Sequence, residues 1–407
     1  MKQVINLKKT FILLLFLSFL FALSACQRTT TFPNPSSTYC VSSNDPSYYK
    51  CDINWTSYFD TRIILTVYIN SETDIMVEPL FEEVRTILSH YHELFDKYNG
   101  YEGVVGIHTI NQSADTFDEV SGLYGKQTIS TELFQAIEYA LVHEDIVKAG
   151  TVSLFNIALG PVLEIWHDLR EQSSCTETLL LGALVCPTPN PEIFNQSFAI
   201  NPKQIVLDES DSSIGFQVSG MRLDLGGYAK GYVAEIITDY LDTLDIPYIL
   251  NAGSSNVKAG GINPNTTDGF YYIGLQRPMI GFSLESQLYS FVKMAEGLSI
   301  VTSGNYQRYF IGFEDDQIYH HIIDPRTYYP GGDTMAVSVF HEDGAIADIL
   351  STAVYLLGLE DGLLYVNQTE GLEAVWYLSD GTIVVSNGLQ EDTFQYQNKP
   401  YPIYSLK

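Results

Sequence analysis

One short segment combines an acid, two glycines and a lysine in an order that suits a phosphate-binding turn. In Asp224-Leu-Gly-Gly-Tyr-Ala-Lys230 the end of an apolar strand meets Gly226 and Gly227, and a helical pattern begins at Lys230. Glycines let a backbone approach a ligand closely, and free amides at a helix N-terminus favour phosphate. The spacing matches neither a Walker A nor a Rossmann loop. A strand–turn–helix with a capping acid and a solvated lysine is the alternative.

A second segment places one carboxylate in an otherwise apolar helix. Within residues 345–357 only Asp348, Ser351 and Thr352 are strongly polar, and Asp348 and Thr352 are four apart and share a face. A buried carboxylate needs a partner, and a metal ion is one of the few that suffices. Carboxylate and hydroxyl oxygens together with phosphate oxygens and water suit Mg²⁺. The alternative is an acid stabilised by the free amides and dipole of the first helical turn.

A third segment, Tyr319-His-His-Ile-Ile-Asp-Pro-Arg326, contains a histidine beside a rigid turn. The proline restricts the residue before it to an extended or turn conformation, which determines where His321 and Ile323 point. A histidine can serve as a general base near neutral pH. The alternative is a histidine bonded to the main chain near the turn. Nearby, Arg308 either lines a pocket or covers a sheet edge.

The elements that must position these residues are both helices and strands. A buried helix with an aromatic residue is expected within 150–166, and 171–203 is expected to be a looser insert. The periodic patterns predict helices over 76–95, 131–149, 230–241 and 344–357, and strands over 61–69, 204–208, 214–218, 248–274 and 373–385. The absence of a strict strand–helix alternation predicts the α+β class, with mixed sheets and packed helices in a single large domain.

The N-terminus has the pattern of an export signal. Three lysines precede an apolar run over 11–22, which is too short for a comfortable membrane span. The run ends in Leu-Ser-Ala-Cys26, which resembles the signals of bacterial lipoproteins. We therefore expect a signal peptide over 1–25, lipidation of Cys26 and a location on the outer side of the cell membrane. An ordinary signal with a bystander cysteine is the alternative. A Ser-, Thr- and Pro-rich tether is expected over 26–55, a body over 56–392 and a tail over 393–407.

Four further cysteines fall in two pairs with eleven-residue spacing. Outside the cytoplasm we expect the disulfides Cys40–Cys51 and Cys175–Cys186, with four unpaired thiols as the alternative.

The net charge of −28 restricts the ligands. Nucleic acid is excluded as a partner, because phosphate neutralisation needs patches of lysine and arginine. The field of an acidic body also repels an anionic substrate, so a phosphate site must supply its own positive charge.

Taken together and in this order, the segments resemble the FAD:protein FMN transferase family, whose older name is the thiamine-biosynthesis lipoprotein family. The match covers roughly residues 56–390, and its most specific pieces are 224–231 and 321–327, supported by 302–306 and 347–353. The resemblance implies Mg²⁺-dependent transfer of the FMN half of FAD to a threonine hydroxyl of an acceptor protein, with release of AMP. The acceptor would be a membrane redox-pump subunit or an extracellular flavoprotein.

The resemblance also assigns residues. Asp348 and Thr352 would bind Mg²⁺ through their side chains and Gly227 through its carbonyl, while His321 would be catalytic. The expected FAD contacts are Phe59, Tyr98, Leu154, Phe155, Asn156, Asp224, Lys230 and Ile323.

Two departures from the family pattern stand out. Many members have an acid where this chain has Asn156, and many have Asn-Ala-Gly-Gly-Asp where this chain has Asn-Ala-Gly-Ser-Ser-Asn over 251–256. The insert at 171–203 would alter access to the cleft. Two other readings stay open: a hydrolase that splits FAD into FMN and AMP with water, and a non-catalytic FAD-binding lipoprotein.

Overall fold

The computed structural model describes residues 38–389 apart from 71, 74, 178–182, 254, 280–287 and 295, together with the backbone of 394–396 and 403–404. The predicted signal peptide, Cys26 and the first part of the tether lie outside the described residues. Within the described part, no helix is long and apolar enough to cross a membrane.

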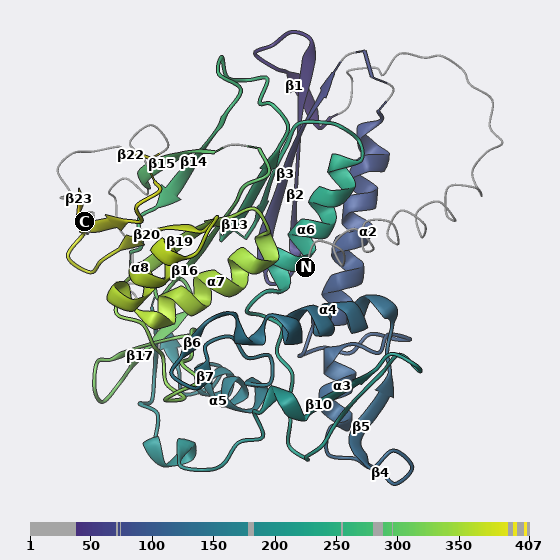
Figure 1. The fold of residues 1–407 in the computed structure, drawn as a ribbon, viewed down its shortest axis with the longest axis vertical. Coiled ribbons are helices and arrows are strands. Elements are labelled where there is room, and N and C mark those ends of the chain that lie inside the picture. The colour runs from purple at the N-terminus through teal and green to yellow at the C-terminus, as the bar shows by residue number, and fades with distance from the viewer. Residues whose placement is uncertain are drawn as a thin grey trace.

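The centre of the molecule is a ten-stranded sheet in the order β1-β2-β3-β12-β13-β16-β19-β20-β21-β23 (Figure 1). All neighbouring pairs in it are antiparallel except β21 and β23. Its strands are β1 (Cys40–Ser42), β2 (Tyr48–Tyr58), β3 (Thr61–Asn70), β12 (Tyr248–Ala252), β13 (Asn256–Gly260), β16 (Ser299–Gly304), β19 (Ala336–His341), β20 (Glu373–Tyr377), β21 (Ile383–Val385) and β23 (Ile403–Tyr404). An antiparallel sheet with separate helices confirms the predicted α+β class.

Helices cover one face of this sheet and a β-hairpin covers the other, because side chains alternate along each strand. In β19, Val337 and Val339 pack toward α7, whereas Ala336 and Phe340 pack toward β14 and β15. The predicted strand over 61–69 and the predicted helices over 76–95 and 344–357 are confirmed as β3, α2 and α7. The helices are α2 (Val77–Phe95), α3 (Ile107–Ser113), α4 (Thr131–Val142), α5 (Gly160–Arg170), α6 (Ala229–Asp242), α7 (Gly344–Leu357) and α8 (Leu359–Gln368), with 3-10 turns η1 (Glu144–Ile146), η2 (Pro191–Phe194) and η3 (Pro202–Gln204).

Smaller sheets complete the fold. They comprise β10 (Ile205–Asp208), β11 (Ser213–Phe216), β5 (Leu123–Thr128) and β4 (Phe117–Asp118); β18 (Ile318–His320), β17 (Tyr309–Gly312), β9 (Leu184–Cys186) and β8 (Thr176–Glu177); β14 (Tyr271–Gln276), β15 (Leu288–Met294) and β22 (Phe394–Tyr396); and β6 (Lys148–Ala149) with β7 (Val152–Ser153). The predicted strand pair at 204–218 is confirmed as β10 and β11, which are antiparallel.

Three predicted boundaries are wrong. The helix expected over 131–149 ends at Val142, because His143 contacts the carbonyl of Tyr139 through its ring and the chain then forms η1 and β6. The tether expected over 26–55 includes β1 and most of β2, which belong to the main sheet. The tail expected over 393–407 contributes β22 and β23, each of which adds to a sheet.

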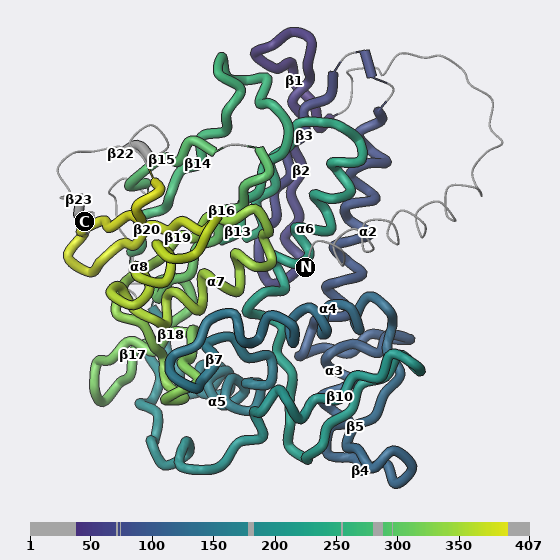
Figure 2. Tube along the Cα trace, viewed as in Figure 1, coloured from purple at the N-terminus to yellow at the C-terminus, as the bar shows by residue number. Residues whose placement is uncertain are grey.

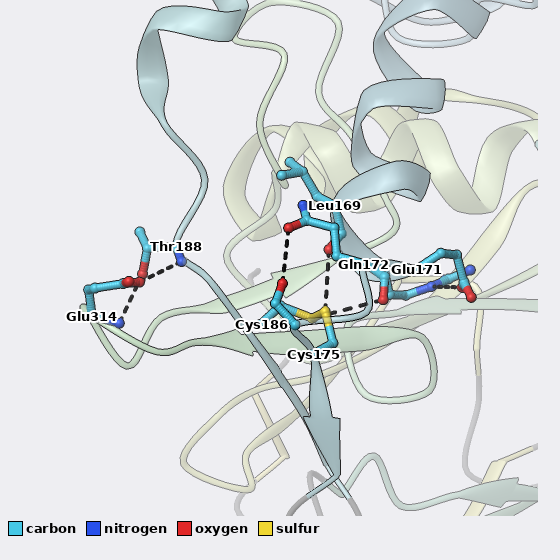
Figure 3. The surroundings of a disulfide bond; sticks show 9 residues. Leu169, Glu171, Gln172, Cys175, Cys186, Thr188 and Glu314 are labelled. Atoms are coloured by element: carbon cyan, nitrogen blue, oxygen red, sulfur yellow. Dashed lines mark hydrogen bonds and ion pairs between the residues drawn. A yellow bond between two sulfur atoms is a disulfide. The ribbon is translucent and has the colours of Figure 1, made fainter.

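Both predicted disulfides are present, Cys40–Cys51 and Cys175–Cys186. The second one joins two points within the insert, and the strand that contains Cys186 pairs with the rest of the molecule (Figure 3). Cys186 is the parallel register partner of Gly312 in β17, and the amide of Thr188 donates to the Glu314 carboxylate over 2.6 Å. The insert predicted to be loose is therefore tied into a four-stranded sheet.

Candidate active site

A cavity of about 570 Å³ lies where the layer of α2, α6 and α7 meets α5 and the β17–β18 hairpin. Figure 2 traces the chain through these segments. The structure brings together in its wall every described residue that the sequence selected, namely Phe59, Tyr98, Leu154, Phe155, Asn156, Asp224, Gly227, Lys230, His321, Ile323, Asp348 and Thr352. A volume of this size falls within the range of small-molecule sites.

The turn at 224–230 holds its acid in a defined orientation. One carboxylate oxygen of Asp224 accepts from the Lys97 ammonium over 2.6 Å, and the other accepts from the Gly226 amide over 2.7 Å. Burial alone would raise the pKa of Asp224, but the charge and hydrogen bond of Lys97 outweigh it and hold that pKa below its usual value. Asp224 is therefore a carboxylate at neutral pH.

Asp348 lies on α7, and the negative charge of its carboxylate is only partly compensated. Its carboxylate accepts from the Gly231 amide over 2.9 Å, and the Lys230 ammonium is 4.0 Å away. Burial raises the pKa of Asp348, and the charge of Lys230 offsets only part of that effect. The site thus contains a buried carboxylate with spare capacity for a cation.

Glycine at position 231 is what allows this contact. A Cβ there would overlap the carbonyl oxygen of Gly344 and come within 2.8 Å of the Asp348 Cβ. The first turns of α6 and α7 therefore pack backbone to backbone, which sets Lys230 beside Asp348.

The donors near Asp348 fit a hard divalent cation. Thr352 follows one helical turn later, and its hydroxyl lies 3.3 Å from that of Ser303. Among the described residues, no group of three or more His, Cys, Asp and Glu side chains could hold a metal ion. One carboxylate, one hydroxyl and the backbone carbonyl of Gly227 would suit Mg²⁺, which normally keeps waters and takes further oxygens from phosphates.

His321 lines the cavity, and one of its two ring nitrogens makes a hydrogen bond within the protein. Its Nδ1 lies 3.2 Å from the carbonyl oxygen of Arg308, and a carbonyl can only accept, so Nδ1 carries the proton and Nε2 is free to accept one. Desolvation by the surrounding cavity wall, followed by the charges of Arg308, His320 and Lys230, lowers the pKa of His321 to about 3. The ring is neutral throughout the physiological range.

The Asp-Pro turn acts as the sequence suggested. The Arg326 guanidinium donates to both oxygens of Asp324, at 2.9 and 2.6 Å, and to the carbonyl of Leu356 at the end of α7 over 2.8 Å. Ile323 forms an isolated antiparallel bridge with Pro330. The turn therefore anchors the His321 segment to the helix that carries Asp348.

Aromatic side chains also line the cavity. Phe59 and Asp60 connect β2 and β3 in a two-residue hairpin turn with φ values of 54° and 50°, the conformation of a type I′ turn. The Phe59 ring lies 5.5 Å from that of His92. Tyr98 is half exposed and its ring is tilted over His167, with centroids 4.5 Å apart.

The Leu154-Phe155-Asn156 segment contributes mainly to the shape of the cavity wall. The Asn156 amide donates to the carbonyl of Ile200 over 2.9 Å and accepts from the amide of Ala158 over 2.8 Å. The side chain that replaces the family's acid is thus used to hold the end of the insert. Phe155 is buried against Tyr228, with ring centroids 5.7 Å apart.

Sequence reasoning missed several polar residues of the cavity wall, among them Lys97, His167 and Arg170, and left one open. These three were not selected, since none lies in a recognisable motif. Arg308, for which two interpretations were open, lines the cavity. Lys97, Arg170, Lys230 and Arg308 answer the problem posed by the acidic body, because they place positive charge in the wall of the cavity.

The comparisons with known proteins agree with this geometry. The model of the ApbE family matches residues 59–376. The FAD:protein FMN transferase of Klebsiella pneumoniae is 30% identical over 300 residues, which cover 72% of this chain and 84% of that protein. The protein of the same name from Treponema pallidum is 27% identical, over 64% of this chain and 69% of its own length.

Solved structures show the same fold. The crystal structure of the ApbE protein of Thermotoga maritima has a TM-score of 0.65 at 23% identity and covers 84% of this chain and 97% of its own. The flavin transferase ApbE of Vibrio cholerae has a TM-score of 0.63 at 17% identity and covers 83% and 98%.

Proposed function

This chain belongs to the ApbE family, and from that premise we propose that it is an FAD:protein FMN transferase that binds FAD in the cavity described above. The observation that carries the proposal is the meeting of two segments. The glycine-containing turn at 224–230 and the Asp348–Thr352 face of α7 line one cavity, 124 residues apart in the chain when measured from Asp224 to Asp348. The acceptor group is proposed to be a threonine hydroxyl of another protein.

The reaction is a phosphoryl-type transfer, in which catalysis is mostly positioning and charge neutralisation. The threonine oxygen attacks the phosphorus of the FMN half, the bond from that phosphorus to the bridging oxygen breaks, and AMP leaves with that oxygen. The threonine proton passes to Nε2 of His321. Lys230 compensates the negative charge of the diphosphate as the bond to AMP breaks.

Asp348, Thr352 and the carbonyl of Gly227 would hold Mg²⁺, which when bound neutralises phosphate charge. The hard-oxygen donor set and the incompletely compensated carboxylate of Asp348 support this part of the proposal.

One incubation separates this function from its rivals. The purified protein is mixed with FAD, MgCl₂ and an acceptor domain that bears the target threonine. Fluorescent flavin that stays on the acceptor after denaturation supports transfer. AMP formed at the same rate without acceptor indicates hydrolysis, and FAD that remains bound and intact indicates storage. Either of the last two results would overturn the proposal.

Replacing His321 with alanine should lower the rate constant of transfer by about 100-fold, the usual contribution of a positioned general base. Because burial lowers the pKa of His321 to about 3, the neutral base is present at pH 6–8, and the wild-type rate should show no step near pH 6.5 from this residue. Single-turnover rates between pH 5 and 9 measure both effects. His90→Ala, on the exposed face of α2, is the control. Transfer by the His321 variant at the wild-type rate would remove the assignment.

We further propose that Cys26 is lipidated and that the enzyme works on the outer side of the membrane, on a redox-pump subunit or an extracellular flavoprotein. The proposal rests on the basic, apolar and small-residue pattern that precedes Cys26. Cells that express the full chain should incorporate labelled fatty acid into it, and the Cys26→Ser variant should not. Equal labelling of both proteins would exclude lipidation at this residue.

A further inference from the structure

Lys97 is a buried cation that the proposed reaction does not yet use. It follows α2, and its ammonium lies in the cavity wall, with 17% of the side chain exposed. The 2.6 Å ion pair with Asp224 joins the end of α2 to the start of the phosphate turn, across 127 residues of sequence. The same ammonium lies 4.9 Å from the centre of the Tyr98 ring. Lys97 therefore contacts two predicted FAD-binding side chains.

The loop that carries Lys97 is held rigidly. Asp96 accepts from the amides of Tyr98 and Asn99 over 2.7 and 3.0 Å and from the Tyr101 hydroxyl over 2.9 Å. On the other side, the amide of His108 donates to the carbonyl of Asp96 over 3.1 Å. The loop therefore fixes where the Lys97 side chain begins, and the 2.6 Å ion pair between two mostly buried side chains is formed before any ligand enters.

The Lys97–Asp224 ion pair lies in the cavity wall and would therefore affect the binding of an anionic ligand. An uncompensated carboxylate at Asp224, whose side chain is mostly buried, would repel the diphosphate of a dinucleotide. Lys97 cancels that charge and, with Gly226, fixes both oxygens of Asp224. The chain has 21 lysines and arginines and 49 acidic residues. A cation in the cavity wall is therefore a local feature of an acidic protein.

We propose that Lys97 is a positioning residue for FAD, which holds Asp224 and the Tyr98 ring in their binding arrangement. This inference rests on the proposed function. Lys97 acts on binding of the dinucleotide and not on the reacting phosphorus, which the proposed mechanism places beside Lys230 and His321.

The test is Lys97→Met, which keeps the length of the side chain and removes its charge. Loss of one charge-assisted hydrogen bond should weaken FAD binding by about 10- to 100-fold, measured by quenching of flavin fluorescence. The KM for FAD should rise by the same factor, while kcat at saturating FAD changes by less than about threefold if only binding depends on this bond. Lys97→Arg should recover most of the affinity, because a guanidinium can pair with the same carboxylate.

Two controls separate this role from a structural one. Lys126→Met removes the same charge from the exposed pair with Asp211, which lies outside the cavity wall, and should leave the affinity for FAD unchanged. In an Asp224→Asn background, Lys97→Met should cost no more than about twofold further, because only the weaker contact of Lys97 with the Tyr98 ring is left to lose. Additive losses, or an affinity within twofold of the wild type in the single variant, would overturn the inference. Failure of the wild type to bind FAD would instead overturn the proposed function.

Discussion

Replacing Asp348 with asparagine should lower the rate of FMN transfer by about 1,000-fold, which corresponds to about 4 kcal/mol of transition-state stabilisation. Asp348 is the only carboxylate among the three proposed Mg²⁺ donors, and an amide keeps its shape but not its charge. Single-turnover transfer from FAD to the acceptor, at several MgCl₂ concentrations, measures the loss. Raising MgCl₂ should recover little of the rate, since the remaining donors are neutral.

A second measurement distinguishes this role from a structural one. Burial raises the pKa of Asp348, so its charge is unfavourable to folding in the absence of a cation. Without metal, Asp348→Asn should therefore be at least as stable as the wild type in urea unfolding, because an amide oxygen can still accept from Gly231. With MgCl₂, only the wild type should gain stability. Asp361→Asn, at an exposed position in the first turn of α8, is the matched control. A normal rate of transfer in the Asp348 variant would contradict the proposal that Asp348 binds Mg²⁺.

Gly231→Ala should both destabilise the fold and disable the site. The added methyl would overlap the Gly344 carbonyl, and because the obstacle is backbone, α6 and α7 must separate. Overpacking of this kind costs about 3 kcal/mol, and the helix propensity gained by alanine, about 1 kcal/mol, offsets only part of it. Lys230 and Asp348 would move apart, and a shift of about 1 Å at a catalytic group can cost about 100-fold in rate. Urea unfolding and single-turnover transfer measure the two effects.

The matched control is a glycine in a neighbouring helix. At Gly362 in α8 a Cβ would lie 3.1 Å from the carbonyl oxygen of Val354, so the neighbour needs to yield only slightly. Gly362→Ala should therefore change stability by less than about 1 kcal/mol, because the small crowding and the gain in helix propensity oppose one another. If Gly231→Ala were as stable and as active as the Gly362 variant, close packing of α6 and α7 would not be needed for the site.

Local sequence patterns were sufficient to predict the structure wherever neighbours in sequence are also neighbours in space. The β-branched run at β3 and the apolar helix α7 were recognised because periodicity is set by residues a few positions apart. Cys40 and Cys51 are eleven residues apart and are register partners in β1 and β2, so their pairing was within reach of the sequence. The end of α4 was missed because apolar spacing continues past Val142, where the chain turns into a strand.

The candidate site was only partly accessible from the sequence. Motif resemblance selected the residues, and the structure gathered them in one cavity, but neither the partner of Asp224 nor the protonation of His321 follows from a motif. Lys97 stands in a loop with no chemical signature of its own. The low pKa of His321 arises from desolvation by the cavity wall, from the charges of Arg308 and Lys230, which come from separate segments, and from the adjacent His320.

The sequence by itself determined which segments carry chemistry, because residue types and their local spacing are properties of the chain. The sequence also indicated that a phosphate site needs positive charge of its own, because the rest of the chain is strongly acidic. Only the tertiary structure decided how that charge is supplied. The packing of α6 between α2 and α7 sets Lys97 against Asp224 and Lys230 beside Asp348. Contacts of this range depend on how sheets and helices pack, which no pattern of neighbouring residues encodes.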